Sequence, residues 1–165
     1  MKILGIDPGY AILGYGVVEM RGNHFTACGF GAVTTGANEE MTSRLKHIYH
    51  ELMNVIAEFE PEAASIEELF FNTNQKTIIA VSEARGVILL AAQKNKLDIG
   101  EYTPLQVKQS VVGYGRAEKV QVMTMVKNIL NLEKIPKPDD AADALAIAIC
   151  HAHSKSTSSL ISRFT

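Results

Sequence analysis

The sequence predicts an α/β domain built on a five-stranded mixed sheet, with three antiparallel strands, then two parallel strands, flanked by helices. Two observations predict it. Three apolar segments joined by short turns occupy the first 34 residues, and helical periodicity then alternates with two further strand segments. A chain of 165 residues that is 47% hydrophobic can bury one sizeable core. We therefore expect a single domain over residues 1–153, followed by a flexible tail over 154–165.

The first predicted strand ends in a lone carboxylate. Lys2-Ile3-Leu4-Gly5-Ile6 leads into Asp7, and the breaker Pro8-Gly9 follows. Because a strand holds its last side chain rigidly, Asp7 can be aimed at a metal ion or a substrate. An aspartate that only caps the Asp-Pro-Gly turn is the alternative, and this segment alone does not decide between them.

Two more strands are predicted before any helix. The segment from Leu13 to Met20 is the second, and the turn signal Arg21-Gly22-Asn23-His24 leads to a third from about Phe25 to Thr34. Strands joined by such short turns form an antiparallel meander. The glycines at 14, 16, 29 and 31 leave bare backbone, which indicates close approach by another backbone or a ligand, or simple bulges.

A long helix follows, from about Asn38 to the breaker Pro61. Its apolar residues recur at spacings of three and four, so that one stripe packs on the sheet: Met41, Leu45, Ile48, Leu52 and Phe59. His47 and His50 fall on the outer face of this helix. We interpret them as solvated side chains rather than ligands.

The fourth strand, from Ala63 to about Leu69, carries the second acidic feature, Glu67-Glu68. Because side chains alternate between the faces of a strand, only one of the two glutamates can point toward Asp7. Periodicity does not say which one. Phe70 and Phe71 come directly after this strand.

The next helix, from about Gln75 to Lys94, is apolar nearly all round. Such a helix needs two covering surfaces, so besides the sheet we expect a second subunit there. Full burial inside one subunit is the alternative. The residues predicted to form the dimer interface are Ile78, Val81, Arg85 and Ile88.

A basic segment follows the fifth strand, which spans Leu97 to Tyr102. Pro104 opens a short helix that carries Lys108, and a glycine-rich loop over 112–119 then leads into a helix up to Leu130. The loop can expose backbone N–H groups to a phosphate, with charge added by Arg116 and Lys119. An ordinary flexible connection is the alternative.

The last predicted helix begins near Pro138 and carries three aspartates in its first turns. Asp140 and Asp143 are three residues apart and share a face, as do Asp139 and Asp143 at a spacing of four. Acids in a first turn often serve only the helix dipole. An aspartate within the Ala- and Ile-rich run needs a stronger reason, because burying an unpaired charge is costly.

Together these acids suggest a metal-dependent hydrolase. If the first and fourth strands are neighbours, Asp7 and one of Glu67 and Glu68 lie side by side, and the last helix can bring its aspartates over them. Carboxylates so close must take up protons or bind cations, and all-oxygen ligation selects magnesium or manganese. Two such ions about 4 Å apart would activate a water and stabilise a leaving oxygen. The chemistry this suggests is phosphodiester hydrolysis.

The charge distribution fits a nucleic-acid substrate. The net charge is −2, but residues 1–75 carry 4 basic against 10 acidic side chains, whereas residues 76–127 carry 8 against 4. One segment thus supplies carboxylates and another can meet phosphates. An unevenly charged solvated surface is the alternative. With two cysteines in no zinc-ligand spacing and no membrane-length apolar run, a cytoplasmic protein is expected.

Several motifs, in order from Lys2 to about His153, resemble the RuvC family of Holliday junction resolvases. They are Gly5-Ile6-Asp7-Pro8-Gly9, Gly14-Tyr15-Gly16, Ile66-Glu67, Ala84-Arg85-Gly86, Gln106-Val107-Lys108-Gln109, Gly113-Tyr114-Gly115-Arg116-Ala117-Glu118-Lys119 and Asp140-Ala141-Ala142-Asp143-Ala144-Leu145-Ala146. The resemblance implies an RNase H-like fold and a homodimer with two magnesium-dependent sites. It also implies paired cuts in a four-way DNA junction during recombination and repair, and branch-migration motors of the RuvA and RuvB type as partners.

The resemblance also assigns individual residues. It places the family's four catalytic acids, which are also its metal ligands, on Asp7, Glu67, Asp140 and Asp143. It places the DNA-contacting lysines on Lys108 and Lys119 and the aromatic that stacks on junction bases on Phe70. Leu13 departs from the threonine that many members carry there, which puts any hydroxyl contact at this point in doubt.

Three other functions compete with this prediction. An actin-like sugar kinase or ATPase also has a first strand ending in an acid, but it usually needs a second, similar domain. A non-catalytic junction-binding scaffold would not need all four acids. A general nuclease of the same fold would cleave a plain duplex or an RNA–DNA hybrid rather than a four-way junction.

Overall fold

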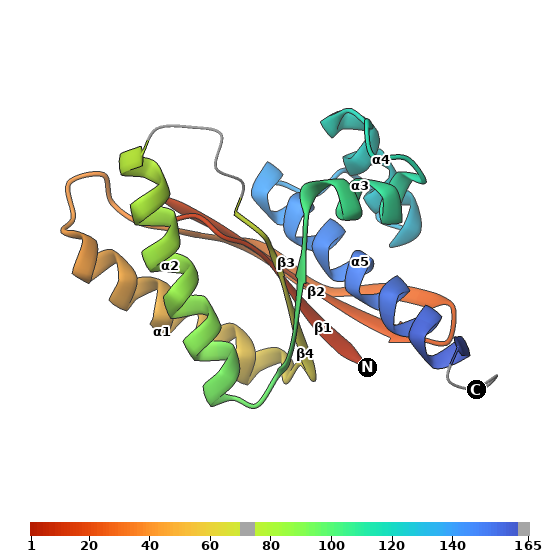
Figure 1. The fold of residues 1–165 in the computed structure, drawn as a ribbon, viewed down its shortest axis with the longest axis horizontal. Coiled ribbons are helices and arrows are strands. Elements are labelled where there is room, and N and C mark those ends of the chain that lie inside the picture. Colours follow the sequence, from red (N-terminus) through yellow and green to blue (C-terminus); the bar gives the residue numbers. More distant parts are fainter. Residues whose placement is uncertain (70–74, 162–165) are drawn as a thin grey trace.

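The computed structural model describes residues 1–69 and 75–161, which form one sheet with helices on both of its faces (Figure 1). The elements in chain order are β1 (Lys2–Asp7), β2 (Ile12–Arg21), β3 (His24–Thr34), α1 (Met41–Phe59), β4 (Ala63–Glu67), α2 (Gln75–Lys94), β5 (Asp98–Tyr102), α3 (Pro104–Val112), α4 (Lys119–Ile129) and α5 (Asp139–Ile161).

The predicted mixed sheet is confirmed. Its strand order is β3-β2-β1-β4-β5. The pairs β1–β2 and β2–β3 are antiparallel, whereas β1–β4 and β4–β5 are parallel. In the parallel pair Ile6 lies opposite Ile66, so Asp7 and Glu67 come next in their strands. The two acids therefore sit side by side where β1 and β4 end.

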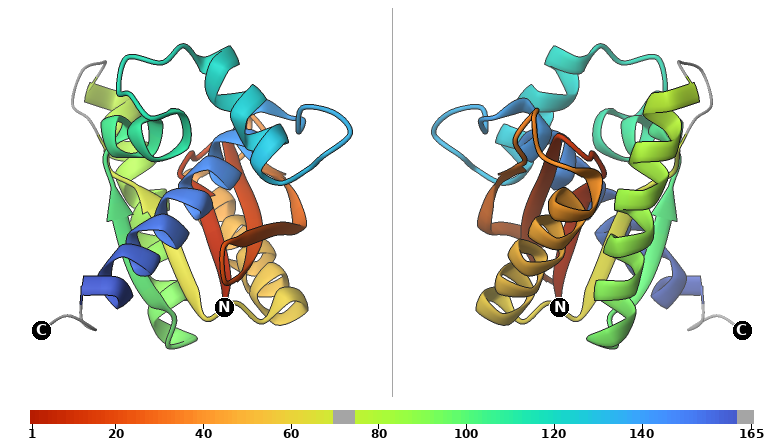
Figure 2. Two further views of the ribbon diagram at one scale, coloured as in Figure 1. Left: turned by 90° about the vertical axis from the view of Figure 1, so that its right-hand side faces the viewer. Right: turned by 90° about the vertical axis from the view of Figure 1, so that its left-hand side faces the viewer.

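Each face of the sheet has its own core. Figure 2 shows α1 and α2 lying together over one face and α5 crossing the opposite one, with α3 and α4 on the same side as α5. Residues such as Ile6, Leu52 and Ile88 fill the core beneath α1 and α2, and Ile3, Val126 and Leu145 fill the other. The helices therefore form two cores, one on each face of a single sheet.

Glycines let α5 lie directly on the central strands. A Cβ atom on Gly5 would lie 2.0 Å from the Ala144 carbonyl oxygen, and one on Gly14 would lie 2.1 Å from that of Asp140. Side chains at these positions would push the helix off the sheet. The close backbone approach predicted for Gly14 is thus observed, and it brings the acidic start of α5 next to β1 and β2.

The last helix is longer than the sequence predicted. It continues through the Ser-rich segment to Ile161, past the boundary expected at residue 153. Two contacts explain the first part of this extension. The Ser154 hydroxyl donates to the Cys150 carbonyl at 3.0 Å, so this polar side chain is hydrogen-bonded within the helix. Lys155 forms an ion pair with Asp98 of β5. Within the described residues, no helix has the length and apolar character that crossing a membrane requires.

Replacing Gly5 by alanine should destabilise the protein by about 2–4 kcal/mol, because the added methyl group would meet α5 backbone that cannot move away. Urea unfolding followed by circular dichroism measures the change. Gly36→Ala is the matched control, since its Cβ would meet only the flexible side chain of Glu39 and should change stability by no more than about 0.5 kcal/mol. Equal stability of the two variants would contradict the close seating of α5.

Candidate active site

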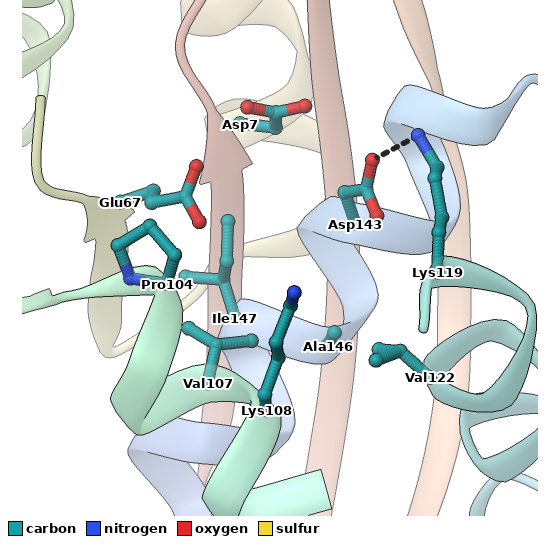
Figure 3. Close-up of a pocket in the computed structure, with 10 residues that line it drawn as sticks. All are labelled: Asp7, Glu67, Pro104, Val107, Lys108, Lys119, Val122, Asp143, Ala146 and Ile147. Atoms are coloured by element: carbon teal, nitrogen blue, oxygen red, sulfur yellow. Dashed lines mark hydrogen bonds and ion pairs between the residues drawn. The ribbon is translucent and has the colours of Figure 1, made fainter. Parts of the chain in front are cut away.

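A pocket of about 220 Å³ opens where β1 and β4 end, between the sheet, α3 and the start of α5 (Figure 3). Its charged side chains come from five elements: β1, β4, α3, α4 and α5. The lining residues are Asp7, Glu67, Pro104, Val107, Lys108, Lys119, Val122, Asp143, Ala146 and Ile147. Figure 3 shows the Asp7, Glu67 and Asp143 carboxylates entering it from β1, β4 and α5.

The alternation of the strands decides which glutamate faces this pocket. Ser65 lies opposite Gly5, whose missing side chain is replaced by α5, so Ser65 is on the α5 side of the sheet. Two residues on, Glu67 is on the same side. Glu68 is exposed, and its backbone N–H donates to the Tyr102 carbonyl at 2.8 Å. The choice that the sequence left open therefore falls on Glu67.

The three aspartates of α5 have different environments. Asp143 lines the pocket, whereas Asp139 lies outside it and pairs with Lys137 at 2.6 Å. Asp140 packs its backbone on Gly14 and does not line the pocket, but its charge is close enough to raise the pKa of Asp7. The structure thus brings together Asp7, Glu67 and Asp143, with Asp140 beside them.

Burial and mutual repulsion favour the protonated forms of Asp7 and Glu67. The pKa of Asp7 is raised to about 7, first by burial and then by the charges of Glu67, Asp143 and Asp140. The pKa of Glu67 is also raised, by burial and then by Asp143. The surroundings therefore disfavour the ionised forms of these carboxyl groups, and a bound cation would offset their negative charge.

Two lysines offset part of this charge. The Lys119 amine donates to the Asp143 carboxylate at 2.8 Å and lies 3.9 Å from Asp139. This hydrogen bond raises the pKa of Lys119, which therefore stays charged at neutral pH. Lys108 extends its amine into the pocket from α3, and its charge partly offsets the rise in the pKa of Glu67. Both lysines predicted to contact DNA thus line the same pocket as the acids.

The glycine-rich loop has a role in the local structure. Gly113 adopts a left-handed conformation (φ 93°) and ends α3, and its N–H donates to the Gln109 carbonyl at 2.9 Å. Gly115 packs against Leu105. The Gly113 N–H is thus already used within the fold, whereas Arg116 is exposed.

The donor chemistry fits a hard divalent cation, because the clustered ligands are carboxylate oxygens with raised pKa values. Within residues 1–69 and 75–161, however, no group of three or more acidic, histidine or cysteine side chains already has the spacing of a metal site. The hydrogen bond of Asp143 to Lys119 occupies one potential ligand. An ion would therefore have to draw the carboxylates together.

The predicted interface residues of α2 do not all face outward. Ile78, Val81 and Arg85 are partly exposed, and Arg85 pairs with Glu101 of β5. Ile88 has no exposed surface and packs in the core, so its assignment to the interface is wrong. A helix that is apolar all round gives no contrast from which its buried side can be predicted.

Sequence reasoning missed two exposed residues on α2. Ile79 is 61% exposed and Leu90 is 56% exposed, and both are large apolar residues. Their spacing of eleven residues, three helical turns, places them on one side of α2 and could have identified them. Phe70 and Phe71 lie outside the described residues.

Convergent carboxylates at the ends of two parallel strands, closed by an acidic helix and flanked by lysines, are the arrangement that a metal-dependent nuclease requires. Comparisons with known proteins support this class. The family model for the crossover junction endodeoxyribonuclease RuvC matches residues 3–151. The RuvC protein of Alkaliphilus oremlandii is 60% identical over 153 residues, which are 93% of each chain.

Solved structures agree. The chain matches Thermus thermophilus RuvC with a TM-score of 0.89 and 37% identity, covering 96% of this chain and 97% of that one. It matches T. thermophilus RuvC in complex with a Holliday junction substrate with a TM-score of 0.91 and 37% identity, covering 96% of each. The fold is therefore RNase H-like, and the chain belongs to the RuvC family of crossover junction endodeoxyribonucleases.

Replacing Asp7 by asparagine should stabilise the metal-free protein above neutral pH. The pKa of Asp7 is about 7 in the folded protein and 3.8 in the unfolded chain. The folded state therefore holds this proton more tightly, and the protein loses stability as pH rises from about 4 to 7. Asparagine removes this loss, so with chelator the variant should gain roughly 1–3 kcal/mol at pH 8 and nothing near pH 4.

Thermal unfolding between pH 4 and 8 measures this difference. Asp139→Asn is the control, because the Lys137 hydrogen bond lowers the pKa of Asp139 and its loss gives no such gain. A stability difference between Asp7→Asn and the unsubstituted protein that does not depend on pH would contradict the raised pKa.

Proposed function

We propose that this protein resolves four-way DNA junctions by metal-dependent phosphodiester hydrolysis, with Asp7, Glu67, Asp140 and Asp143 as its catalytic acids. The observation that carries the proposal is the pocket at the end of β1 and β4, where Asp7, Glu67 and Asp143 meet and the pKa of Asp7 is raised to about 7. The match to T. thermophilus RuvC bound to a Holliday junction substrate supports the choice of substrate.

The same four acids would hold the metal ions, which we assign as two magnesium ions that manganese can replace. Bound there, the ions would supply a nucleophilic water and stabilise the charge on the scissile phosphate. Asp7 and Glu67 provide the rigid ligands, because both stand at the ends of neighbouring strands in the middle of the sheet. Asp143 is available once Lys119 releases it.

Lys108, Lys119 and Arg116 form the DNA-binding side of the site. The two lysines line the pocket from α3 and α4: the Lys108 amine extends into it, and the Lys119 amine lies against Asp143 (Figure 3). When DNA binds, Lys119 gives up its hydrogen bond to Asp143 and pairs with a DNA phosphate, so that the lysine charge stays paired. Arg116 is exposed in the loop just before Lys119 and adds a further phosphate contact. Phe70 would stack on junction bases, as the family resemblance implies.

The active protein would be a homodimer formed through α2. Paired cuts on opposite strands need two equivalent sites, which a two-fold related pair of subunits supplies. α2 lies on the sheet face opposite α5 and exposes Ile79 and Leu90 (Figure 2). The interface would therefore use Ile78, Ile79, Val81 and Leu90, together with the exposed part of Arg85. Motor proteins of the RuvA and RuvB type would act with this dimer in the cytoplasm.

Each of Asp7→Asn, Glu67→Gln, Asp140→Asn and Asp143→Asn should reduce cleavage of a synthetic four-way junction by about 100-fold or more, because each removes a proposed metal ligand. Binding of the junction should remain, since one repulsive charge leaves the DNA site. Gel assays with the junction, a plain duplex and an RNA–DNA hybrid measure activity and substrate choice.

The neighbouring acids serve as controls for these variants. Glu68→Gln and Asp139→Asn change carboxylates that lie outside the pocket and should cleave the junction at the rate of the unsubstituted protein. Full activity of Asp7→Asn, or preferential cleavage of the duplex or the hybrid by the unsubstituted protein, would overturn the proposed function.

Replacing Leu90 or Ile79 by arginine should weaken dimerisation by about tenfold or more, because a charge would enter an apolar contact. Analytical ultracentrifugation measures the dimer dissociation constant, and circular dichroism checks that the variants fold. His47→Arg, on the outer face of α1, is the control and should leave the dimer intact. Unchanged dimers in both α2 variants would exclude this helix as the interface.

A further inference from the structure

Three large apolar side chains are exposed on α3, on α4 and in the loop between them. Leu105, Tyr114 and Val120 have 54%, 46% and 62% of their surface exposed, and we call them the rim patch. Leu105 follows Pro104 and Val120 follows Lys119, and both of those neighbours line the pocket. The Tyr114 hydroxyl bonds to Gln121 of α4, and Gly115 packs against Leu105, so the rim patch spans the starts of α3 and α4 and the loop between them, next in sequence to residues that line the pocket.

The rim patch is held in place although it is exposed. The Tyr114 hydroxyl donates to the Gln121 side-chain oxygen at 3.0 Å, and that oxygen also accepts the Glu118 N–H at 2.8 Å in the cap of α4. Leu105 packs against Gly115 in the same loop. The ring of Tyr114 is thus fixed before any ligand arrives, which lowers the entropy cost of binding to it.

The charges around the rim patch indicate what binds to it. Lys108 and Lys119 lie on its pocket side, and Arg116 is exposed in its loop. A surface that alternates phosphate-binding cations with an aromatic ring is suited to a single nucleic-acid strand, whose phosphates and base faces alternate. α3 and α4, which carry Leu105 and Val120, lie on the α5 side of the sheet, away from the proposed dimer helix (Figure 2).

We infer that the rim patch, with Tyr114 at its centre, contacts a nucleotide next to the scissile phosphate and contributes to the choice of cleavage sequence. Tyr114 stacks on the base or packs on the deoxyribose, and Leu105 and Val120 support that nucleotide from either side. The inference rests on the proposed function, and it assigns Tyr114 a specificity role rather than a catalytic one, because it does not line the pocket.

The test combines a binding signal with cleavage mapping. The cut is first located with the unsubstituted protein on junctions that differ only in the base pairs flanking it. 2-Aminopurine is then placed on each side of the cut and its fluorescence followed on binding to the inactive Asp7→Asn protein, with and without Tyr114→Ala or Tyr114→Phe. His47→Ala, which removes an exposed ring on the opposite face, is the matched control.

Stacking predicts that 2-aminopurine fluorescence is quenched by the Asp7→Asn protein and its Tyr114→Phe derivative, and that quenching is lost with Tyr114→Ala. With Asp7 intact, Tyr114→Ala should lower the ratio of cleavage rates between preferred and disfavoured junctions about tenfold. Tyr114→Phe and His47→Ala should keep that ratio.

Two outcomes overturn the inference in distinguishable ways. If Tyr114→Ala retains both the quenching and the cleavage preference of its parent, the rim patch does not contact the flanking nucleotide while the proposed function stands. If the unsubstituted protein neither binds nor cleaves the junction, the proposed function fails and the inference fails with it.

Discussion

The direct contact of α5 with β1 and β2 is the constraint on which the site depends. Gly5 and Gly14 leave no side chain between strand and helix, and the facing residues of α5 include alanines such as Ala144 and Ala148. Because the two backbones approach so closely, the first turns of α5 reach the ends of β1 and β4. A bulkier residue on either side would separate Asp143 from Asp7 and leave the pocket without one of its walls.

Without a bound cation, the clustered acids lower the stability of the folded protein. The acids are gathered in a partly buried place, and their repulsion raises the pKa of Asp7 to about 7. Lys119 and Lys108 compensate only in part, since the pKa of Asp7 stays raised although Lys119 lowers it. The same repulsion that reduces stability is what gives the pocket its attraction for cations, so stability and proposed activity are opposed at these residues.

The two faces of the sheet serve different purposes. The face covered by α3, α4 and α5 holds the acids, the lysines and the rim patch, whereas on the other face α2 exposes the large apolar residues Ile79 and Leu90. Sequence reasoning expected a second subunit on α2 from the all-round apolar character of that helix, but it did not predict which functions each face of the sheet carries. It failed at Ile88, because a helix without polar contrast does not reveal which of its sides meets the sheet.

Local sequence determined the order of strands and helices, the antiparallel meander of the first three strands and the acid at the end of β1, since these follow from periodicity and turn residues over short stretches. The tertiary structure decided what depends on distant partners. The strand pairing of Ser65 with Gly5 selected Glu67 over Glu68, and the packing of α5 on Gly5 and Gly14 placed Asp143, not Asp139, in the pocket. Lys155, beyond the expected end of α5, pairs with Asp98 of β5. Each of these outcomes joins residues that only the folded chain brings together or orients, and no local pattern encodes them.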